Sequence, residues 1–280
     1  MVDKPGLYQA FLLYAKSLLL CPIISKEKRM DSFISWIGGK KLLRKAILNE
    51  FPQKNDIGRY IEVFGGAGWL LFARDSHAPM EVFNDVNSNL INLYRCVKYH
   101  PETLQKEIEW NLISREQFYE KREKIVFQGE TDIQRAADYF LLIKNSFGAD
   151  CRSFGLKNKD LLKATDFLTQ VSIRLRKTVI ENIDFERLIK VYDRDNALFY
   201  ADPPYFEAEK YYPDRFNIED HSRLKNVLGN IKGKFILSYN DCKQIRDLYH
   251  NYNIISVERQ NNLKAKCRSE KYNELIIKNY

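Results

Sequence analysis

The chain has 280 residues, of which 45% are hydrophobic, enough for a sizeable buried core. Its twelve glycines and eight prolines are too few for a fibrous or largely disordered protein. A formal net charge of +8 favours a polyanionic partner, such as nucleic acid, or a membrane surface.

The cysteines and histidines indicate a reduced protein without a metal. No two of the five cysteines form a C-x-x-C pair, and a chain of this length does not need disulfides, so we expect a cytoplasmic setting. With four histidines and no paired cysteines, we expect no zinc site.

Residues 1–29 precede the first recognisable α/β element. Their stretch LYQAFLLYAKSLLLCPII looks like the core of a signal peptide, but Lys16 interrupts it and no small-residue cleavage site follows. We expect an amphipathic helix here. No segment approaches about eighteen consecutive uncharged apolar residues, so we expect no membrane span.

The α/β pattern opens with two strands and two helices. A Gly-rich turn, GGAG, separates the first strand from the first helix, and Asn87 or Ser88 could cap the second helix. This order is typical of a doubly wound α/β domain. The expected elements are strand 59–64 (RYIEVF), helix 69–75 (WLLFARD), strand 80–85 (MEVFND) and helix 89–98.

Residues 100–175 interrupt this pattern with helical periodicity alone. Three helices are predicted, over 101–112, 115–127 and 132–147, followed by a loop over 148–160. Between residues 144 and 177 there are eight Lys or Arg against three Asp. We expect an inserted helical lobe with an exposed basic edge.

The α/β pattern resumes at about residue 176 and continues to residue 280. The last two strands are expected to form an antiparallel hairpin. The sheet domain would thus comprise residues 30–99 and 176–280. Its further expected elements are strands 178–182, 196–202, 234–240, 253–258 and 274–280, with helices 184–192, 218–231 and 242–250.

A glycine loop and an acid suggest a cofactor that carries a nucleoside. VFGGAG lies between a strand and a helix, where glycines let the backbone approach a ligand. The spacing Gly66-x-Gly68-x-x-Leu71 lacks the third glycine of the dinucleotide fingerprint. Asp85 ends the next strand about 20 residues beyond Gly65, where a carboxylate can bind ribose hydroxyls.

WIGGKK, over residues 36–41, does not form a P-loop. That motif needs an earlier glycine and a Ser or Thr after the lysine, whereas Lys41 follows Lys40. From the residues alone, Lys40 is interpreted as a surface lysine in the first turn of a helix.

ADPPY, over residues 201–205, is the most specific motif in the sequence. Asp202 ends a strand at the edge where open α/β sheets bind ligands. The two prolines fix φ and remove two N–H donors, so the loop can present carbonyl acceptors. With the flat ring of Tyr205, this set suits a planar amine such as the amino group of a nucleobase.

Four motifs together resemble the Dam-type DNA adenine-N6 methyltransferases, which use S-adenosylmethionine (SAM). They are FISWIGGKKLL, YIEVFGGAGWLLF, EVFNDVNSNLINLY and LFYADPPYF, in the order of that family, within residues 30–280. The resemblance implies a Rossmann-like α/β methyltransferase sheet, a helical DNA-recognition lobe inserted in it, and SAM as cofactor without a metal. It implies double-stranded DNA as a partner and is compatible with a cognate restriction endonuclease as a second partner.

The resemblance also assigns residues. The catalytic set would be Asp202, Pro203, Pro204 and Tyr205. The cofactor would be bound by Trp36, Lys40, Phe64, Gly65, Gly66, Gly68, Asp85, Asp184 and Asp202, and Asn182, Asp184 and Phe185 would line its adenine. In place of a surface role, Lys40 would then contact SAM.

The implied reaction explains why a buried strand would end in an acid and two prolines. The target adenine would be flipped out of the duplex, and Tyr205 would stack on it. The Asp202 carboxylate and the Pro203 carbonyl would accept hydrogen bonds from its amino group. The nitrogen lone pair would thereby be kept from delocalising into the ring and could attack the methyl group.

Two regions depart from the family pattern. About thirty residues precede the Trp–Gly–Gly–Lys motif, and MDSFISWIGGK from Met30 looks like a family start, so we expect residues 1–29 to be either an appended helix or an upstream mis-start. In the lobe, members that recognise GATC carry Asn-Arg followed by Asn-Gly. Here KNSFGADCRSFG retains Asn145 but replaces that arginine with Ser146. The candidate DNA-binding residues are Lys144, Asn145 and Arg152, with Arg152 as a reader of guanine.

Other functions stay open at this point. A cytosine-N4 methyltransferase shares the amino-group chemistry, although such enzymes more often carry Ser at the position of Asp202. A DNA-binding relative without catalysis would retain DNA affinity but lose SAM binding. Methylation of RNA or of a protein glutamine is a third alternative, although the glutamine enzymes typically carry Asn-Pro-Pro-Tyr.

Overall fold

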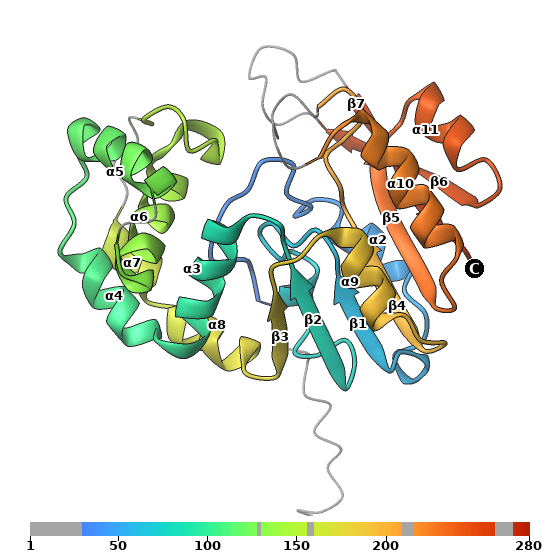
Figure 1. The fold of residues 1–280 in the computed structure, drawn as a ribbon, viewed down its shortest axis with the longest axis horizontal. Coiled ribbons are helices and arrows are strands. Elements are labelled where there is room, and N and C mark those ends of the chain that lie inside the picture. Colours follow the sequence, from blue (N-terminus) through green and yellow to red (C-terminus); the bar gives the residue numbers. More distant parts are fainter. Residues whose placement is uncertain (1–29, 128–129, 156–159, 209–215, 261–270) are drawn as a thin grey trace, which may run out of the picture.

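The computed structural model describes residues 30–280 apart from 128–129, 156–159, 209–215 and 261–270. The expectations for residues 1–29 fall outside the described residues. In the described part, a single seven-stranded sheet has the order β3-β2-β1-β4-β5-β7-β6, with helices on both of its faces and a helical lobe to one side (Figure 1).

The sheet confirms the expected doubly wound α/β class and the C-terminal hairpin. Strands β3, β2, β1, β4 and β5 pair in parallel. The last strand, β7, is antiparallel to both β5 and β6 and lies between them. The bounds are β1 Arg59–Glu62, β2 Met80–Asn84, β3 Thr178–Glu181, β4 Ala197–Ala201, β5 Lys234–Asn240, β6 Asn253–Gln260 and β7 Lys271–Lys278.

The central strands are apolar because both of their faces are covered. All five residues of β4 are buried, as expected for a strand of a parallel sheet between two helical layers. Leu198 and Tyr200 of β4 pack into the core on one face. Ala197, Phe199 and Ala201 pack into the core on the other. The alternation along β4 thus joins the two halves of the hydrophobic core.

Helices α2 (Arg44–Asn49) and α3 (Ser88–Tyr99) contribute to the first core. The other face is covered by α9 (Phe185–Tyr192), α10 (Ile218–Gly229) and α11 (Lys243–Leu248). Of the two expected caps of α3, the structure selects Asn87, whose Oδ1 accepts from the N–H groups of Asn89 and Leu90. None of the described helices is long and apolar enough to cross a membrane.

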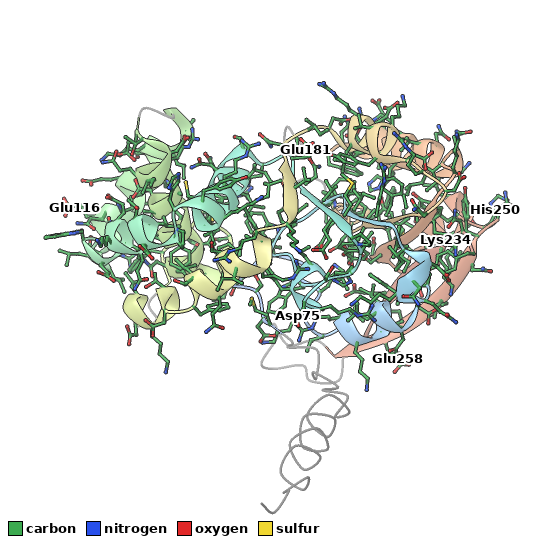
Figure 2. The ribbon with its side chains drawn as sticks, turned by 90° about the horizontal axis from the view of Figure 1, so that it is seen from below. Asp75, Glu116, Glu181, Lys234, His250 and Glu258 are labelled. Atoms are coloured by element: carbon green, nitrogen blue, oxygen red, sulfur yellow. The ribbon has the colours of Figure 1, made fainter. Side chains whose placement is uncertain are left out.

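The helices between α3 and β3 form a lobe beside the sheet (Figure 1). They are α4 (Pro101–Glu109), α5 (Arg115–Phe127), α6 (Asp132–Asn145), α7 (Leu161–Thr165) and α8 (Leu168–Leu175). Helix α6 packs against α3, α4 and α5, and the Asn87 amide donates to the Tyr139 hydroxyl at 2.6 Å. Glu116 on α5 and His250 after α11 mark opposite ends of the molecule (Figure 2).

The helix predicted over residues 69–75 was wrong. Only a short 3₁₀ turn, Leu71–Ala73, forms there. The segment's carbonyl groups bond to side chains from elsewhere instead of to a continuing helix. The buried guanidinium of Arg174 on α8 donates to the carbonyl oxygens of Leu71 and Arg74, and a ring nitrogen of His77 lies 2.7 Å from the Leu70 carbonyl oxygen.

Candidate active site

A cavity of about 510 Å³ opens at the carboxyl ends of β1, β2 and β4. This is the edge at which open α/β sheets bind ligands. The cavity brings together three of the sequence motifs: the WIGGKK segment, the glycine loop and DPPY. Its lining residues are Trp36, Ile37, Gly38, Gly39, Lys40, Glu62, Phe64, Gly65, Gly66, Ala67, Trp69, Leu70, Asp85, Val86, Tyr200, Asp202, Pro203, Pro204, Tyr205, Ala208 and Phe216.

Lys40 and Asp202 form an ion pair in this cavity. The Lys40 Nζ lies 2.8 Å from Asp202 Oδ1 and donates to the Gly38 carbonyl oxygen at 2.8 Å. Lys40 is only 3% exposed, so its interpretation as a surface lysine was wrong. Burial raises the pKa of the Asp202 carboxyl, and the neighbouring Lys40 ammonium opposes that shift.

Tyr205 is held from two sides. Its hydroxyl donates to Glu274 Oε2 on β7, and the Lys40 Nζ lies 4.6 Å from the centre of its ring. Burial, together with the charges of Asp202 and Glu274, raises the pKa of the Tyr205 phenol. The ring therefore lines the cavity as a neutral face in a fixed orientation.

The glycine loop needs its glycines for two reasons. Gly66 has a φ of +50° and Gly68 a φ of +66°, a region that other L-residues rarely adopt. A Cβ on Gly66 would also lie 2.9 Å from Cδ1 of Trp36, so the indole and the loop are in close contact. Gly68 shapes the turn but does not line the cavity.

Asp85 links this loop to the start of α3. One carboxylate oxygen accepts from the Gly66 N–H at 3.0 Å, and the other accepts from the Asn87 N–H at 2.8 Å. The amide of Asn182 donates to the Asp85 carbonyl oxygen at 2.7 Å. The predicted carboxylate thus lies in the cavity wall beside the glycine loop.

Aromatic rings form a cluster at this side of the cavity. The Phe64 ring centre lies 5.6 Å from that of Phe185 and 5.8 Å from that of Phe216. Phe64 and Phe216 line the cavity, and Phe185 packs behind them. Flat apolar rings of this kind suit a planar heterocycle.

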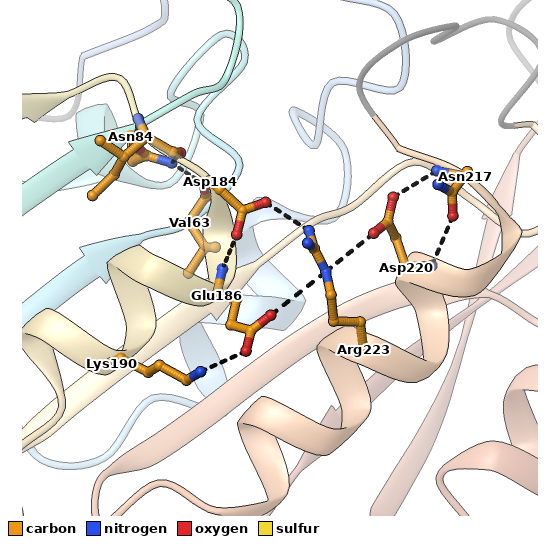
Figure 3. A network of polar contacts seen from close by, with 9 residues as sticks. Val63, Asn84, Asp184, Glu186, Lys190, Asn217, Asp220 and Arg223 are labelled. Atoms are coloured by element: carbon orange, nitrogen blue, oxygen red, sulfur yellow. Dashed lines mark hydrogen bonds and ion pairs between the residues drawn. The ribbon is translucent and has the colours of Figure 1, made fainter.

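Asp184 does not line the cavity. One of its carboxylate oxygens caps α9 through the Glu186 N–H at 2.9 Å, and the other accepts from Arg223 on α10 at 2.6 Å. Arg223 also contacts Asp220 and Glu186 (Figure 3). Asp184 therefore holds α9 and α10 together beneath the aromatic cluster.

Four polar residues of the site were not singled out from the sequence, namely Glu62, Tyr200, Ser238 and Glu274, and neither was the aromatic residue Phe216. Ser238 on β5 donates to Asp202 Oδ1 at 2.8 Å, and the Tyr200 hydroxyl lies 3.1 Å from Ser238 Oγ. Glu62 ends β1 in the cavity wall. Its burial raises the pKa of its carboxyl to about 8.

The three candidate DNA-binding residues lie at the end of α6 and in the loop after it, away from the cavity lining. Arg152 is exposed, while its backbone is held by Asp150 and by the guanidinium of Arg122. The Lys144 Nζ lies 5.2 Å from the Phe140 ring centre. Asn145 is 6% exposed, so its amide faces the lobe interior rather than the surface.

The seven-stranded sheet of this order, with helices on both faces, has the Rossmann-like fold of a methyltransferase. The sequence model of the D12 class N6 adenine-specific DNA methyltransferases matches residues 36–263. The chain belongs to this family. It is an adenine-specific DNA methyltransferase, and methyltransferases of this family in general use SAM as methyl donor.

Named relatives agree with this assignment. The chain is 28% identical to the type II methyltransferase M1.LlaDCHI of Lactococcus lactis subsp. cremoris, over 92% of this chain and 99% of that protein. It is 24% identical to the type II methyltransferase M.CviBI of Paramecium bursaria Chlorella virus NC1A, over 90% and 100% of the two chains. It is also 24% identical to the DNA adenine methylase of Haemophilus influenzae, over 87% and 92%.

Proposed function

We propose that the chain binds SAM in the described cavity and methylates the N6 amine of an adenine flipped out of duplex DNA. The observation that carries this proposal is the meeting of three motifs, namely Trp36–Lys40, the glycine loop with Asp85, and Asp202–Tyr205, around one cavity. The alternative of cytosine-N4 methylation has no comparable support, because the matching family is adenine-specific.

The cavity fits the parts of SAM. The Asp85 carboxylate can bind ribose hydroxyls, and the cluster of Phe64 and Phe216 suits the cofactor's adenine. The contact between Trp36 and Gly66 leaves no room for a Cβ, so the backbone there can approach a ligand closely. Lys40 binds and orients Asp202 at the point where the two motifs meet.

DPPY would hold the target base. The Asp202 carboxylate and the Pro203 carbonyl accept hydrogen bonds from the amino group, and the Tyr205 ring stacks on the base. These bonds keep the nitrogen lone pair out of the ring system. Bound SAM supplies an electrophilic methyl group, and the enzyme's contribution is positioning and charge.

The helical lobe over residues 100–175 would read the DNA sequence. Arg152 is exposed on a loop whose backbone is fixed by hydrogen bonds, and an arginine can bind guanine with two hydrogen bonds. Lys144 would contact a phosphate. Because Asn145 is buried and its backbone carbonyl oxygen accepts from the Gly155 N–H at 2.7 Å, we assign it to shaping the loop.

Partnership with a restriction endonuclease is a further part of this proposal. Two of the relatives are named type II methyltransferases, whereas others are named DNA adenine methylases. The methyltransferase of a type II pair methylates the site that its partner endonuclease cuts. Resistance of the methylated DNA to one endonuclease would therefore support the partnership.

The test is to incubate the protein with SAM and unmethylated genomic DNA and to map modified bases by single-molecule sequencing. We expect N6-methyladenine within one short motif, and no modification with Asp202→Ala. The matched control is Asp195→Ala, an exposed aspartate between α9 and β4, which should keep full activity. Turnover by Asp202→Ala would contradict the catalytic assignment, and N4-methylcytosine would contradict the adenine specificity.

A further inference from the structure

The two oxygens of the Asp202 carboxylate have different partners. Oδ1 accepts from the Lys40 ammonium at 2.8 Å and from the Ser238 hydroxyl at 2.8 Å. Within the part of the chain that the structure describes, no hydrogen bond or ion pair reaches Oδ2. The side chain is 19% exposed and lines the cavity. Oδ1 is therefore held by the protein, whereas Oδ2 can accept a hydrogen bond from a ligand in the cavity.

Ser238 is placed for this contact by the sheet. Strands β4 and β5 are parallel neighbours, with Ala201 paired to Leu237, so the next residue of each strand is Asp202 and Ser238. Ser238 is fully buried. It is a polar residue in an otherwise apolar stretch, FILSY, where burying a hydroxyl costs free energy unless it is hydrogen-bonded.

The direction of the hydrogen bonds follows from the number of protons. An ionised carboxylate can only accept, so Ser238 donates its single hydroxyl proton to Asp202. The Tyr200 hydroxyl, 3.1 Å from Ser238 Oγ, must then donate to Ser238. Tyr200 is 2% exposed. The two hydrogen bonds, from Tyr200 to Ser238 and from Ser238 to Oδ1 of Asp202, thus favour the ionised form of the carboxylate.

We infer that Ser238, supported by Tyr200, is a positioning residue for methyl transfer: it fixes Oδ1 of Asp202 so that Oδ2 accepts the hydrogen bond from the adenine amino group. This inference rests on the proposed function, because it assigns Asp202 to that amino group. Lys40 alone does not fix the plane of the carboxylate, since one ammonium contact leaves the group free to rotate about its Cβ–Cγ bond. A second contact on the same oxygen, from a neighbouring strand, removes that freedom.

The ionisable groups around Asp202 set the expected pH dependence. They are Lys40 from the N-terminal segment, Glu62 from β1, Tyr200 from β4, Tyr205 from the DPPY loop and Glu274 from β7. Burial raises the pKa of Asp202, while the bonds from Lys40 and Ser238 lower it. Loss of the Ser238 hydroxyl should therefore raise this pKa further.

The experiment measures single-turnover methyl transfer against pH for the full-length protein with SAM and a DNA substrate. In Ser238→Ala we expect a rate about tenfold to a hundredfold lower, as for the loss of a hydrogen bond to a charged group. The acid limb of the profile should move to higher pH. Tyr200→Phe should show a smaller effect in the same direction, and adding it to Ser238→Ala should change nothing more.

The matched control is Ser172→Ala, which removes another buried serine hydroxyl, bonded to the Lys98 carbonyl oxygen at 2.8 Å. It should lose stability but keep both the rate and the pH profile. If Ser238→Ala behaves like this control, the inference is wrong while Asp202 can still be catalytic. If Asp202→Ala keeps its turnover, the proposed function itself fails.

Discussion

Glu62 shows how one buried residue can couple folding to pH. It is 2% exposed and accepts a hydrogen bond from the Tyr60 hydroxyl at 2.9 Å. Burial raises the pKa of its carboxyl to about 8. In the folded protein Glu62 is therefore protonated at neutral pH, whereas in the unfolded chain it is ionised above a pKa of 4.5. Folding takes up a proton at this position.

The sign of the pH effect follows. The stabilising contribution of the neutral form is fully present below the unfolded pKa and is lost as pH rises through the folded pKa. Between about pH 5 and 8, Glu62 should lower the free energy of unfolding by up to about 1.4 kcal/mol per pH unit. In Glu62→Gln, unfolding by urea at several pH values should show a shallower decline than in the wild type. Identical slopes would contradict the raised pKa.

Some residues of the site could be predicted from the sequence, and others could not. Asp202 and Tyr205 could be predicted because their motif is local, and the structure brings both into the cavity. Ser238 and Glu274 could not, because their importance depends on which strands lie beside β4. A lone serine in an apolar strand was a signal for Ser238. The sequence around Glu274 carries no comparable feature. Only the placement of β7 beside β5 brings Glu274 to Tyr205.

At the scale of elements, the segment before α2 covers the glycine loop after β1. Trp36 contacts Gly66, and a Cβ on Gly39 would lie 2.7 Å from Nε1 of Trp69. The indole of Trp36 thus packs against the glycine loop, and the indole of Trp69, which follows that loop, packs against Gly39. The two motifs act as one binding surface, although the sequence presents them separately.

Gly66→Ala tests this surface. Its φ of +50° and its contact with Trp36 predict both backbone strain of about 1–2 kcal/mol and a displaced indole. We expect the Kd for SAM to rise at least about tenfold, a change of about 1.4 kcal/mol, measured by calorimetry, with a change in tryptophan fluorescence. Gly148→Ala, at a φ of +61° with no atom within 4 Å, carries similar strain and should bind SAM normally. Unchanged affinity in Gly66→Ala would place the cofactor elsewhere.

Most elements could be predicted from periodicity, and the exceptions depend on distant contacts. In place of the helix expected over residues 69–75, Arg174, about a hundred residues further on, binds the carbonyl oxygens of Leu71 and Arg74. The final hairpin was predicted as a pair, but no local pattern indicated that β7 would insert between β5 and β6. Both cases need the tertiary fold, which a single window of sequence does not contain.

At the scale of the whole molecule, the helical lobe lies to one side of the sheet, next to α3 and β3 (Figure 1). The net charge of +8 suits a DNA duplex. We expect its nonspecific affinity to come from many lysines and arginines, and its choice of site from the few that reach base edges. The loop after α6 is the candidate for that second role, because it is exposed yet fixed by Asp150 and Arg122.

Arg152→Ala separates these two roles. Loss of a guanidinium that reads guanine should cost about 1–3 kcal/mol of discrimination at one base pair, so methylation should spread to sites that differ at that position. Affinity for unrelated DNA should fall little. Lys163→Ala, an exposed lysine on α7, should instead weaken binding to all sequences alike and lower the salt dependence of binding. Methylation rates on oligonucleotides with single base-pair changes, together with binding at several salt concentrations, measure both effects. If Arg152→Ala weakens every sequence equally, Arg152 contacts phosphate, and the base contacts come from another part of the lobe.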